Sequence, residues 1–351
     1  MLIFIFLLAL ELITIGGKQI GEKYAQEIIR ITAQPFPALF IGLLATAIIQ
    51  SSSTITSSIV AMVASGVLSL EAAIPMVMGS NIGTCVTSLI VAFGNLGTPK
   101  AFKRGFSTAS SHVIFNIVSA LLFLPLEIKT GILGKISQYL AGQVSSWSPL
   151  GKSWFVFRDV LLQPSADFLE SVALHQPMLM LPLAFILLFI CIFSLTALFR
   201  FLISGEPGVR RVTSALQKPH LSLFSGMGLT AAIHSSSVTT SMAVMLAASE
   251  KISPKKLFPF VMGANMGTTV TALIAAIGRS EAALAIAICH FLFNLLGVLI
   301  FFPFPTIRKL PYQLARWSGI MANRHLWFAF AYILILFFAL PFLVIFISEK
   351  F

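Results

Sequence analysis

Long apolar segments alternate with short polar ones along this chain. The apolar segments at residues 1–15, 106–126, 177–203, 282–304 and 326–347 are each about long enough to cross a membrane as a helix, although the first is somewhat short. We read residues 1–15 as a first span, because no small-residue cleavage site follows them. The pattern predicts an all-α integral membrane protein.

Two polar runs have shorter apolar flanks. Gln50–Thr54 lies within residues 36–68, and His234–Ser237 lies within residues 221–249. Each flank has about a dozen residues, which as a helix would cover only about 18 Å of a hydrocarbon core of about 30 Å. Two half-length helices that meet at a polar turn predict a re-entrant hairpin, buried in protein or lining a wet cavity.

Two other segments carry residues that disfavour a helix. Residues 72–94 are interrupted at Gly79–Thr84, and residues 257–278 at Gly263–Thr268. Glycine and asparagine are poor helix formers, so the sequence predicts a broken helix in each segment.

The chain contains the same unit twice. Residues 50–94 align with residues 234–278 at a constant offset of 184, without a gap and with about half of the positions identical. Each unit has a hairpin and two crossings, and the single span 177–203 separates the units. We therefore expect two repeats with opposite orientations in the membrane.

These elements divide the chain into four parts. We expect a first repeat at residues 1–126, an external loop with interfacial helices at 127–176, a second repeat at 177–304, and a basic segment with a last span at 305–351. The total is seven crossings and two hairpins. Most Lys and Arg residues lie in short loops that would face the cytoplasm together.

Composition supports a multi-span membrane protein. The chain is 57% hydrophobic and 10% charged, with a mean hydropathy of +0.95. The net charge of +11 comes from short clusters between apolar segments, which fits membrane orientation better than nucleic-acid binding. Three cysteines lie within apolar segments, where we expect small buried side chains and neither a transition-metal site nor a disulfide.

The polar side chains of the repeated segments are uncharged. No Lys, Arg, Asp or Glu occurs in residues 38–70, 72–99, 221–249 and 257–278. Hydroxyl, amide and free backbone oxygens can bind a hard cation such as sodium, and helix N-termini can bind an anion. Moving one ion into an apolar interior costs on the order of 20 kcal/mol before relaxation. The dipole at a helix end stabilises a nearby ion by at most about 2 kcal/mol, which is far less than this cost. We therefore expect cation and anion to enter together.

Purely structural roles for these residues compete with the interpretation that they bind ions. Small residues such as Ser and Gly also mediate close helix packing in membranes, but three consecutive serines point in different directions and fit packing poorly. His112 with Asn116, and His290 with Asn294, each share one helix face. For these pairs, bracing of the broken helices is at least as well supported as substrate contact. A Ser–His catalytic pair lacks a carboxylate to orient it, so we do not expect an enzyme.

The motifs resemble those of the type II sodium-dependent phosphate cotransporter family. The resemblance rests on Gln50–Ser53 followed by Gly79–Thr84, on the second copy through Gly263–Thr269, and on His112-x-x-Phe115-Asn116. It implies sodium-driven uptake of inorganic phosphate across the plasma membrane, or the inner membrane of a prokaryote. With no soluble domain after the last span, the chain looks like a short prokaryotic member. No cofactor is implied besides the transported sodium.

The resemblance also implies where the ligands bind. It assigns phosphate to the two turns, at Gln50, Ser51, Ser52, Ser53, His234, Ser235, Ser236 and Ser237. It assigns sodium to Gln50, Ser53, Thr54, Ser80, Asn81, Thr84, Ser237, Asn265, Thr268 and Thr269. It gives a supporting role to His112, Asn116, His290 and Asn294.

Two positions depart from the family pattern. His234 stands where the family usually has Gln, and Val113 stands where some members have Asp. Members without this Asp move no net charge, so the resemblance implies electroneutral transport of two sodium ions with one divalent phosphate. A carrier of another oxyanion and a phosphate exporter are the alternatives. The oligomeric state is open, with a homodimer as one option.

Overall fold

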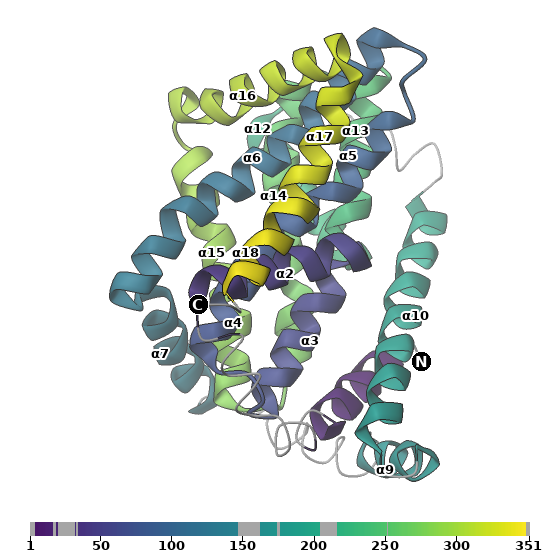
Figure 1. The fold of residues 1–351 in the computed structure, drawn as a ribbon, viewed down its shortest axis with the longest axis vertical. Helices are drawn as coiled ribbons and strands as arrows, with labels where there is room; N and C mark the ends of the chain where they lie inside the picture. Colours follow the sequence, from purple (N-terminus) through teal and green to yellow (C-terminus); the bar gives the residue numbers. More distant parts are fainter. Residues whose placement is uncertain are drawn as a thin grey trace.

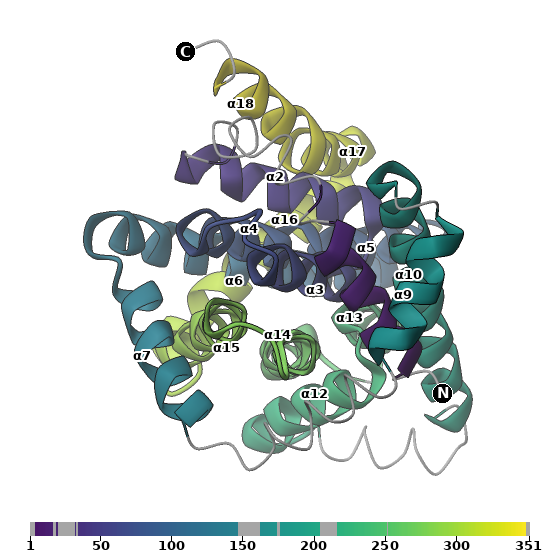
Figure 2. The same ribbon diagram turned by 90° about the horizontal axis from the view of Figure 1, so that it is seen from below.

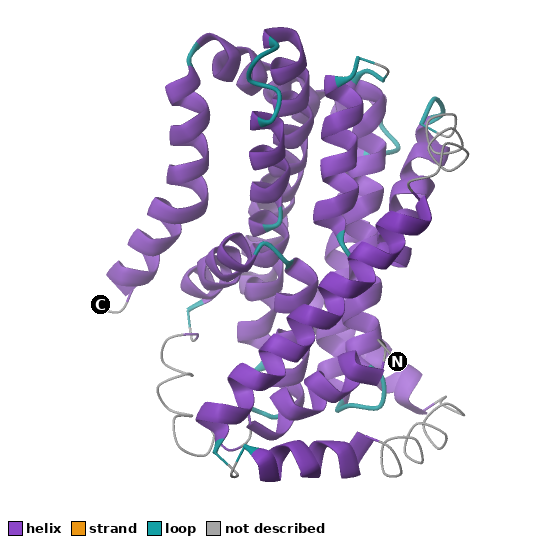
Figure 3. Ribbon diagram, turned by 90° about the vertical axis from the view of Figure 1, so that its right-hand side faces the viewer, coloured by secondary structure: helices purple, strands orange, loops and turns teal. Residues whose placement is uncertain are grey.

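The fold is helical throughout the part that is described. The computed structural model describes residues 4–16, 19, 32, 34–146, 162–173, 176–203, 216–250 and 252–348, and every regular element in them is a helix (Figure 3). After an N-terminal helix at Phe4–Gly16, the elements are α2 (Pro35–Ile49), α3 (Ser52–Ala64), α4 (Leu70–Gly83), α5 (Cys85–Phe93), α6 (Pro99–Thr130), α7 (Ile132–Ser146), α9 (Gln163–Val172), α10 (Pro177–Ile203), α12 (Pro219–Ile233), α13 (Ser236–Ala248), α14 (Pro254–Ala276), α15 (Glu281–Phe301), α16 (Pro305–Arg324), α17 (Leu326–Leu334), the π-helix η2 (Ile335–Ala339) and α18 (Leu340–Ser348) (Figure 1).

Within the described residues, five stretches of helix are long and apolar enough to cross a membrane. They are Leu70–Phe93, Pro99–Thr130, Pro254–Ala276, Glu281–Phe301 and Leu326–Ser348. The expected all-α membrane protein is confirmed at this level. The N-terminal helix and α10 are not among the five, so seven crossings stay a prediction.

One expected boundary differs in the structure. The span expected at residues 106–126 is the middle of a longer helix, α6. Residues 127–176, expected as a loop with interfacial helices, are helical at the end of α6 and in α7 and α9. Residues 147–161 lie outside the described part.

The expectation of two broken helices is wrong for the second copy and overstated for the first. Helix α14 runs without a break through Gly263–Thr268, and the first copy is interrupted only at Thr84, between α4 and α5. The glycines have another role. A Cβ added at Gly79 would collide with the carbonyl oxygen of Leu39, and one at Gly263 with that of Leu223. These glycines therefore let α4 approach α2, and α14 approach α12, at backbone distance.

The two halves of the chain interleave. Helix α3 packs against α14 and α15, while α13 packs against α5 and α6. The end-on view in Figure 2 shows α3, α13 and α14 near the centre of the molecule. Each helix that follows a serine run is thus enclosed partly by helices of the other half.

A buried ion pair joins distant parts of the chain. The Arg279 guanidinium lies 3.6 Å from a carboxylate oxygen of Glu11, and both side chains are less than a tenth exposed. Arg279 also donates hydrogen bonds to Thr14 Oγ1 and to the Ala275 carbonyl. Glu11 is thus buried, and the pair holds the N-terminal helix against the residues that follow α14.

Candidate ion and anion site

The two polar runs form turns with the same backbone geometry. Gln50 ends α2 at φ 56° and ψ 26°, and His234 ends α12 at φ 58° and ψ 25°. This left-handed conformation is uncommon for residues other than glycine. The two residues with this conformation are 184 positions apart, the same offset as the internal similarity of the sequence.

A serine begins the second helix of each turn. Ser51 Oγ accepts the Thr54 N–H at 3.3 Å, and Ser235 Oγ accepts the Val238 N–H at 3.4 Å. These serines are N-caps, because each side chain binds one of the amide groups that has no partner within its helix. The remaining amides and the positive ends of the α3 and α13 dipoles lie at the serine runs.

The two turns touch each other. The Ser53 hydroxyl donates a hydrogen bond of 2.7 Å to the His234 carbonyl oxygen, across 181 positions of sequence. The His234 ring nitrogen Nδ1 lies 3.1 Å from Thr271 Oγ1. Thr271 was not among the expected site residues, although Thr87 recurs as Thr271 at the same offset of 184. The structure thus brings the predicted turns together, with Gln50 exposed and Ser52, Ser53, Ser236 and Ser237 buried.

One expected supporting pair binds a residue of the other repeat. His112 Nε2 lies 2.6 Å from Asn265 Oδ1, and Asn265 Nδ2 donates to Asn116 Oδ1 at 2.6 Å. All three side chains are buried. Helix α6 of the first half therefore braces α14 of the second half.

The second pair makes the reciprocal contact. His290 Nε2 and Asn294 Nδ2 lie 3.4 and 3.3 Å from Asn81 Oδ1, while Asn81 Nδ2 donates to the Val77 carbonyl at 2.9 Å. Helix α15 thus braces α4. In this conformation the amide oxygens of Asn81 and Asn265, two expected sodium ligands, already take part in hydrogen bonds between helices.

Other expected sodium ligands divide into two groups. Ser80 Oγ accepts from Thr46 Oγ1 at 2.8 Å, and Thr269 Oγ1 donates to the Met266 carbonyl at 2.7 Å. By contrast, three hydroxyls at expected site positions are among the eight buried hydroxyls that have no hydrogen-bond partner within the described residues: those of Thr84 and Thr268, expected sodium ligands, and that of Ser236, an expected phosphate ligand. Thr84 and Thr268 are equivalent in the repeat. A buried hydroxyl without a partner is costly, so these three are the strongest candidates to face a bound ion or water.

Comparison with known proteins assigns this arrangement to a family. A family model described as Na+/Pi-cotransporter matches residues 5–142 and 180–313. The chain belongs to the Na+/Pi-cotransporter family. Both matched segments of this family member contain a serine turn and a packing glycine, and the gap between them lies largely in the region expected as an external loop.

Several curated relatives of this Na+/Pi-cotransporter family member are similar over nearly its whole length. Sodium-dependent phosphate transport protein 2A is 29% identical in Rattus norvegicus and 30% identical in Oryctolagus cuniculus, in each case over 99% of this chain and 66% of the relative. Sodium-dependent phosphate transport protein 2B of Homo sapiens is 28% identical over 93% of this chain and 60% of the relative. The chain thus spans less than two thirds of these relatives. No solved structure is significantly similar to it.

Proposed function

We propose that this chain is a secondary active transporter that couples sodium entry to uptake of inorganic phosphate across the plasma membrane. The observation that carries the proposal is the contact between the duplicated turns, Ser53 Oγ to the His234 carbonyl at 2.7 Å. It gathers two helix N-termini and two serine runs at one place in an apolar protein. The relatives' names, which specify sodium-dependent phosphate transport, support the choice of substrate.

In this proposal the phosphate oxygens bind the serine runs. The hydroxyls and free amides at the starts of α3 and α13 donate hydrogen bonds to the anion, and the helix dipoles favour its charge. Sodium binds nearby hydroxyl, amide and backbone oxygens, with Thr84 and Thr268 as leading candidates because their hydroxyls have no other partner. Sodium supplies the positive charge that the uncharged segments lack.

The same proposal gives the chain an inverted-repeat architecture. The helix pairs α2–α3 and α12–α13 would be re-entrant hairpins that enter the membrane from opposite sides. Their matching turns and the extension of α3 and α13 toward opposite ends of Figure 1 support this. In a cysteine-free background, a cysteine at Ser69 should be labelled by an impermeant reagent from one side and a cysteine at Ser253 from the other. Labelling of both from the same side would contradict the inversion.

We further propose that transport is electroneutral. Val113 is fully buried, and its side chain has no oxygen to bind a third cation. Two sodium ions with one divalent phosphate then sum to zero charge. Phosphate-dependent current should be absent in voltage-clamped membranes that take up labelled phosphate, whereas an inward current that scales with uptake would refute this stoichiometry.

Uptake into proteoliposomes tests the function. Labelled phosphate should enter vesicles that contain the protein when the outside buffer holds sodium, and should not enter when choline replaces sodium. Excess unlabelled phosphate should abolish the signal, while excess sulfate should leave most of it. Equal uptake in sodium and choline would refute sodium coupling, and complete competition by sulfate would refute phosphate selectivity.

A further inference from the structure

A basic pocket lies away from the serine turns, at the end of the molecule where α12, α14 and α16 begin. It encloses about 280 Å³. Its lining includes four cationic side chains and two polar ones: Lys255, Lys256, Arg308, Lys309, Gln217 and Tyr312. No carboxylate is among its lining residues. The transport mechanism proposed above uses none of these groups.

Within the described residues, no ion pair neutralises the four cationic side chains. Glu250, the acidic residue at the end of α13, forms an ion pair of 2.6 Å with Lys100, whose hydrogen bond lowers the pKa of Glu250 below its ordinary value. Lys256 Nζ donates to the neutral Gln217 at 2.7 Å, which orients the lysine without cancelling its charge. The Arg308 guanidinium lies 5.5 Å from the centre of the Phe302 ring, another neutral partner.

The backbone adds to the positive potential. Residues at the starts of three helices line the pocket: Pro219 of α12, Ser253 before α14 and Pro305 of α16. None of these helix starts has a side-chain cap or an acidic residue in its first turn. Their amides and dipoles therefore reinforce the four cationic side chains. A cavity with this lining fits a phosphate group.

Helix α16 indicates the source of that phosphate. It lies across one end of the molecule, at a steep angle to α10 and α17 (Figure 1). Ile307, Leu310 and Leu314 are 41%, 53% and 45% exposed and follow one another at helical spacing. This apolar stripe and the pocket-lining Arg308 and Lys309 lie on different faces of α16, an arrangement typical of an amphipathic helix at a membrane interface.

We propose that this pocket binds a phosphate group presented as the headgroup of an anionic phospholipid. Free phosphate could satisfy the cationic lining, but the exposed stripe indicates that α16 lies at the membrane surface, where anionic headgroups are concentrated. The loops that form the pocket are those that the distribution of Lys and Arg places on the cytoplasmic side, where the membrane surface is negative.

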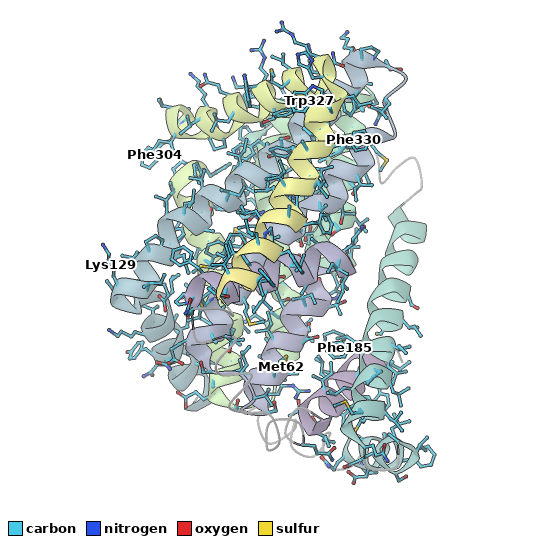
Figure 4. The ribbon with its side chains drawn as sticks, viewed as in Figure 1. Met62, Lys129, Phe185, Phe304, Trp327 and Phe330 are labelled. Atoms are coloured by element: carbon cyan, nitrogen blue, oxygen red, sulfur yellow. The ribbon has the colours of Figure 1, made fainter. Side chains whose placement is uncertain are left out.

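Lipid titration of the full-length protein tests the proposal. Phosphatidylglycerol is added to the protein in neutral detergent, and bound lipid is counted by native mass spectrometry. The double variant Lys255→Gln/Lys309→Gln should bind it about thirtyfold more weakly, since each surface lysine contributes about 1 kcal/mol to anionic-lipid binding. The control Lys129→Gln/Lys135→Gln removes the same charge from exposed lysines outside the pocket (Figure 4 labels Lys129) and should change binding less than threefold.

Further arms separate the outcomes. The charge-conserving variant Lys255→Arg/Lys309→Arg should keep phosphatidylglycerol binding, which distinguishes loss of charge from loss of fold. Inorganic phosphate at millimolar concentration should not displace the lipid; complete displacement would assign the pocket to free phosphate and overturn the lipid source. Equal phosphatidylglycerol binding by the wild type and both Gln variants would overturn the site itself. Phosphate uptake is not the readout, so the outcome is independent of the transport proposal.

Discussion

Two glycines of α12, two residues apart, should respond oppositely to alanine. Gly226 faces α14, and a Cβ at this position would collide with the Phe260 carbonyl oxygen and lie 2.9 Å from its carbon. Gly228 is exposed, and a Cβ there would have no atom within 4 Å. Both residues have ordinary helical backbone, so they differ mainly in what their side-chain hydrogen faces.

The structure gives the sign and size of each effect. Alanine is favoured over glycine within a helix by about 0.8–1.0 kcal/mol, a gain available at both positions. At Gly226 the added methyl group meets backbone, which cannot rotate away, so α12 and α14 must separate. Overpacking of this kind typically costs about 1–3 kcal/mol, sometimes more. We expect Gly228→Ala to stabilise the protein by up to about 1 kcal/mol. Because the methyl group at Gly226 meets rigid backbone, we take the upper end of the overpacking cost and expect Gly226→Ala to destabilise the protein by about 2 kcal/mol after the propensity gain.

Thermal unfolding of the purified protein in detergent measures the difference. The midpoint for Gly226→Ala should fall well below that of the wild type, and the midpoint for Gly228→Ala should equal or exceed it. Equal midpoints for both variants would refute the claim that the repeated glycines permit close helix packing.

Two further predictions concern contacts between the halves. In a double-mutant cycle of His112→Ala and Asn265→Ala, the free energies of unfolding should show a coupling energy of about 0.6–1.7 kcal/mol, as for hydrogen bonds within membranes. Strictly additive changes in the free energy of unfolding would show that the 2.6 Å contact contributes nothing. Glu11→Gln should lower the free energy of unfolding by about 3–5 kcal/mol, because the buried Arg279 charge loses its carboxylate partner. The double variant Glu11→Gln/Arg279→Gln should recover part of this loss. An unchanged free energy of unfolding in Glu11→Gln would show that the pair is not buried in the membrane.

The sequence predicted the turns but not the role of the glycines. The serine runs were recognisable because the repeat places the same polar residues between the same short apolar flanks. Gly79 and Gly263 were misread because helix propensity is a local property, whereas the close approach of α2 to α4 and of α12 to α14 depends on the tertiary fold. No single-segment signal separates a glycine that breaks a helix from one that packs it.

Contacts across the two halves were also beyond the sequence. The spacing of His112 and Asn116 fixed the helix face that they share, but it did not identify Asn265 on α14 as their partner. The partner of Glu11, Arg279, lies in a short turn that carries no motif of its own. Such pairings depend on which helices the fold brings together.

Binding of phosphate in the presence and absence of sodium tests the central claim most directly. If both ions occupy the joined turns, calorimetric titration should show phosphate binding about 5–150-fold more tightly in sodium than in choline, and phosphate should tighten sodium binding by the same factor. Ser236→Ala, which alters a buried hydroxyl of the second turn, should weaken phosphate binding in sodium. An unchanged phosphate affinity between sodium and choline would contradict a shared site.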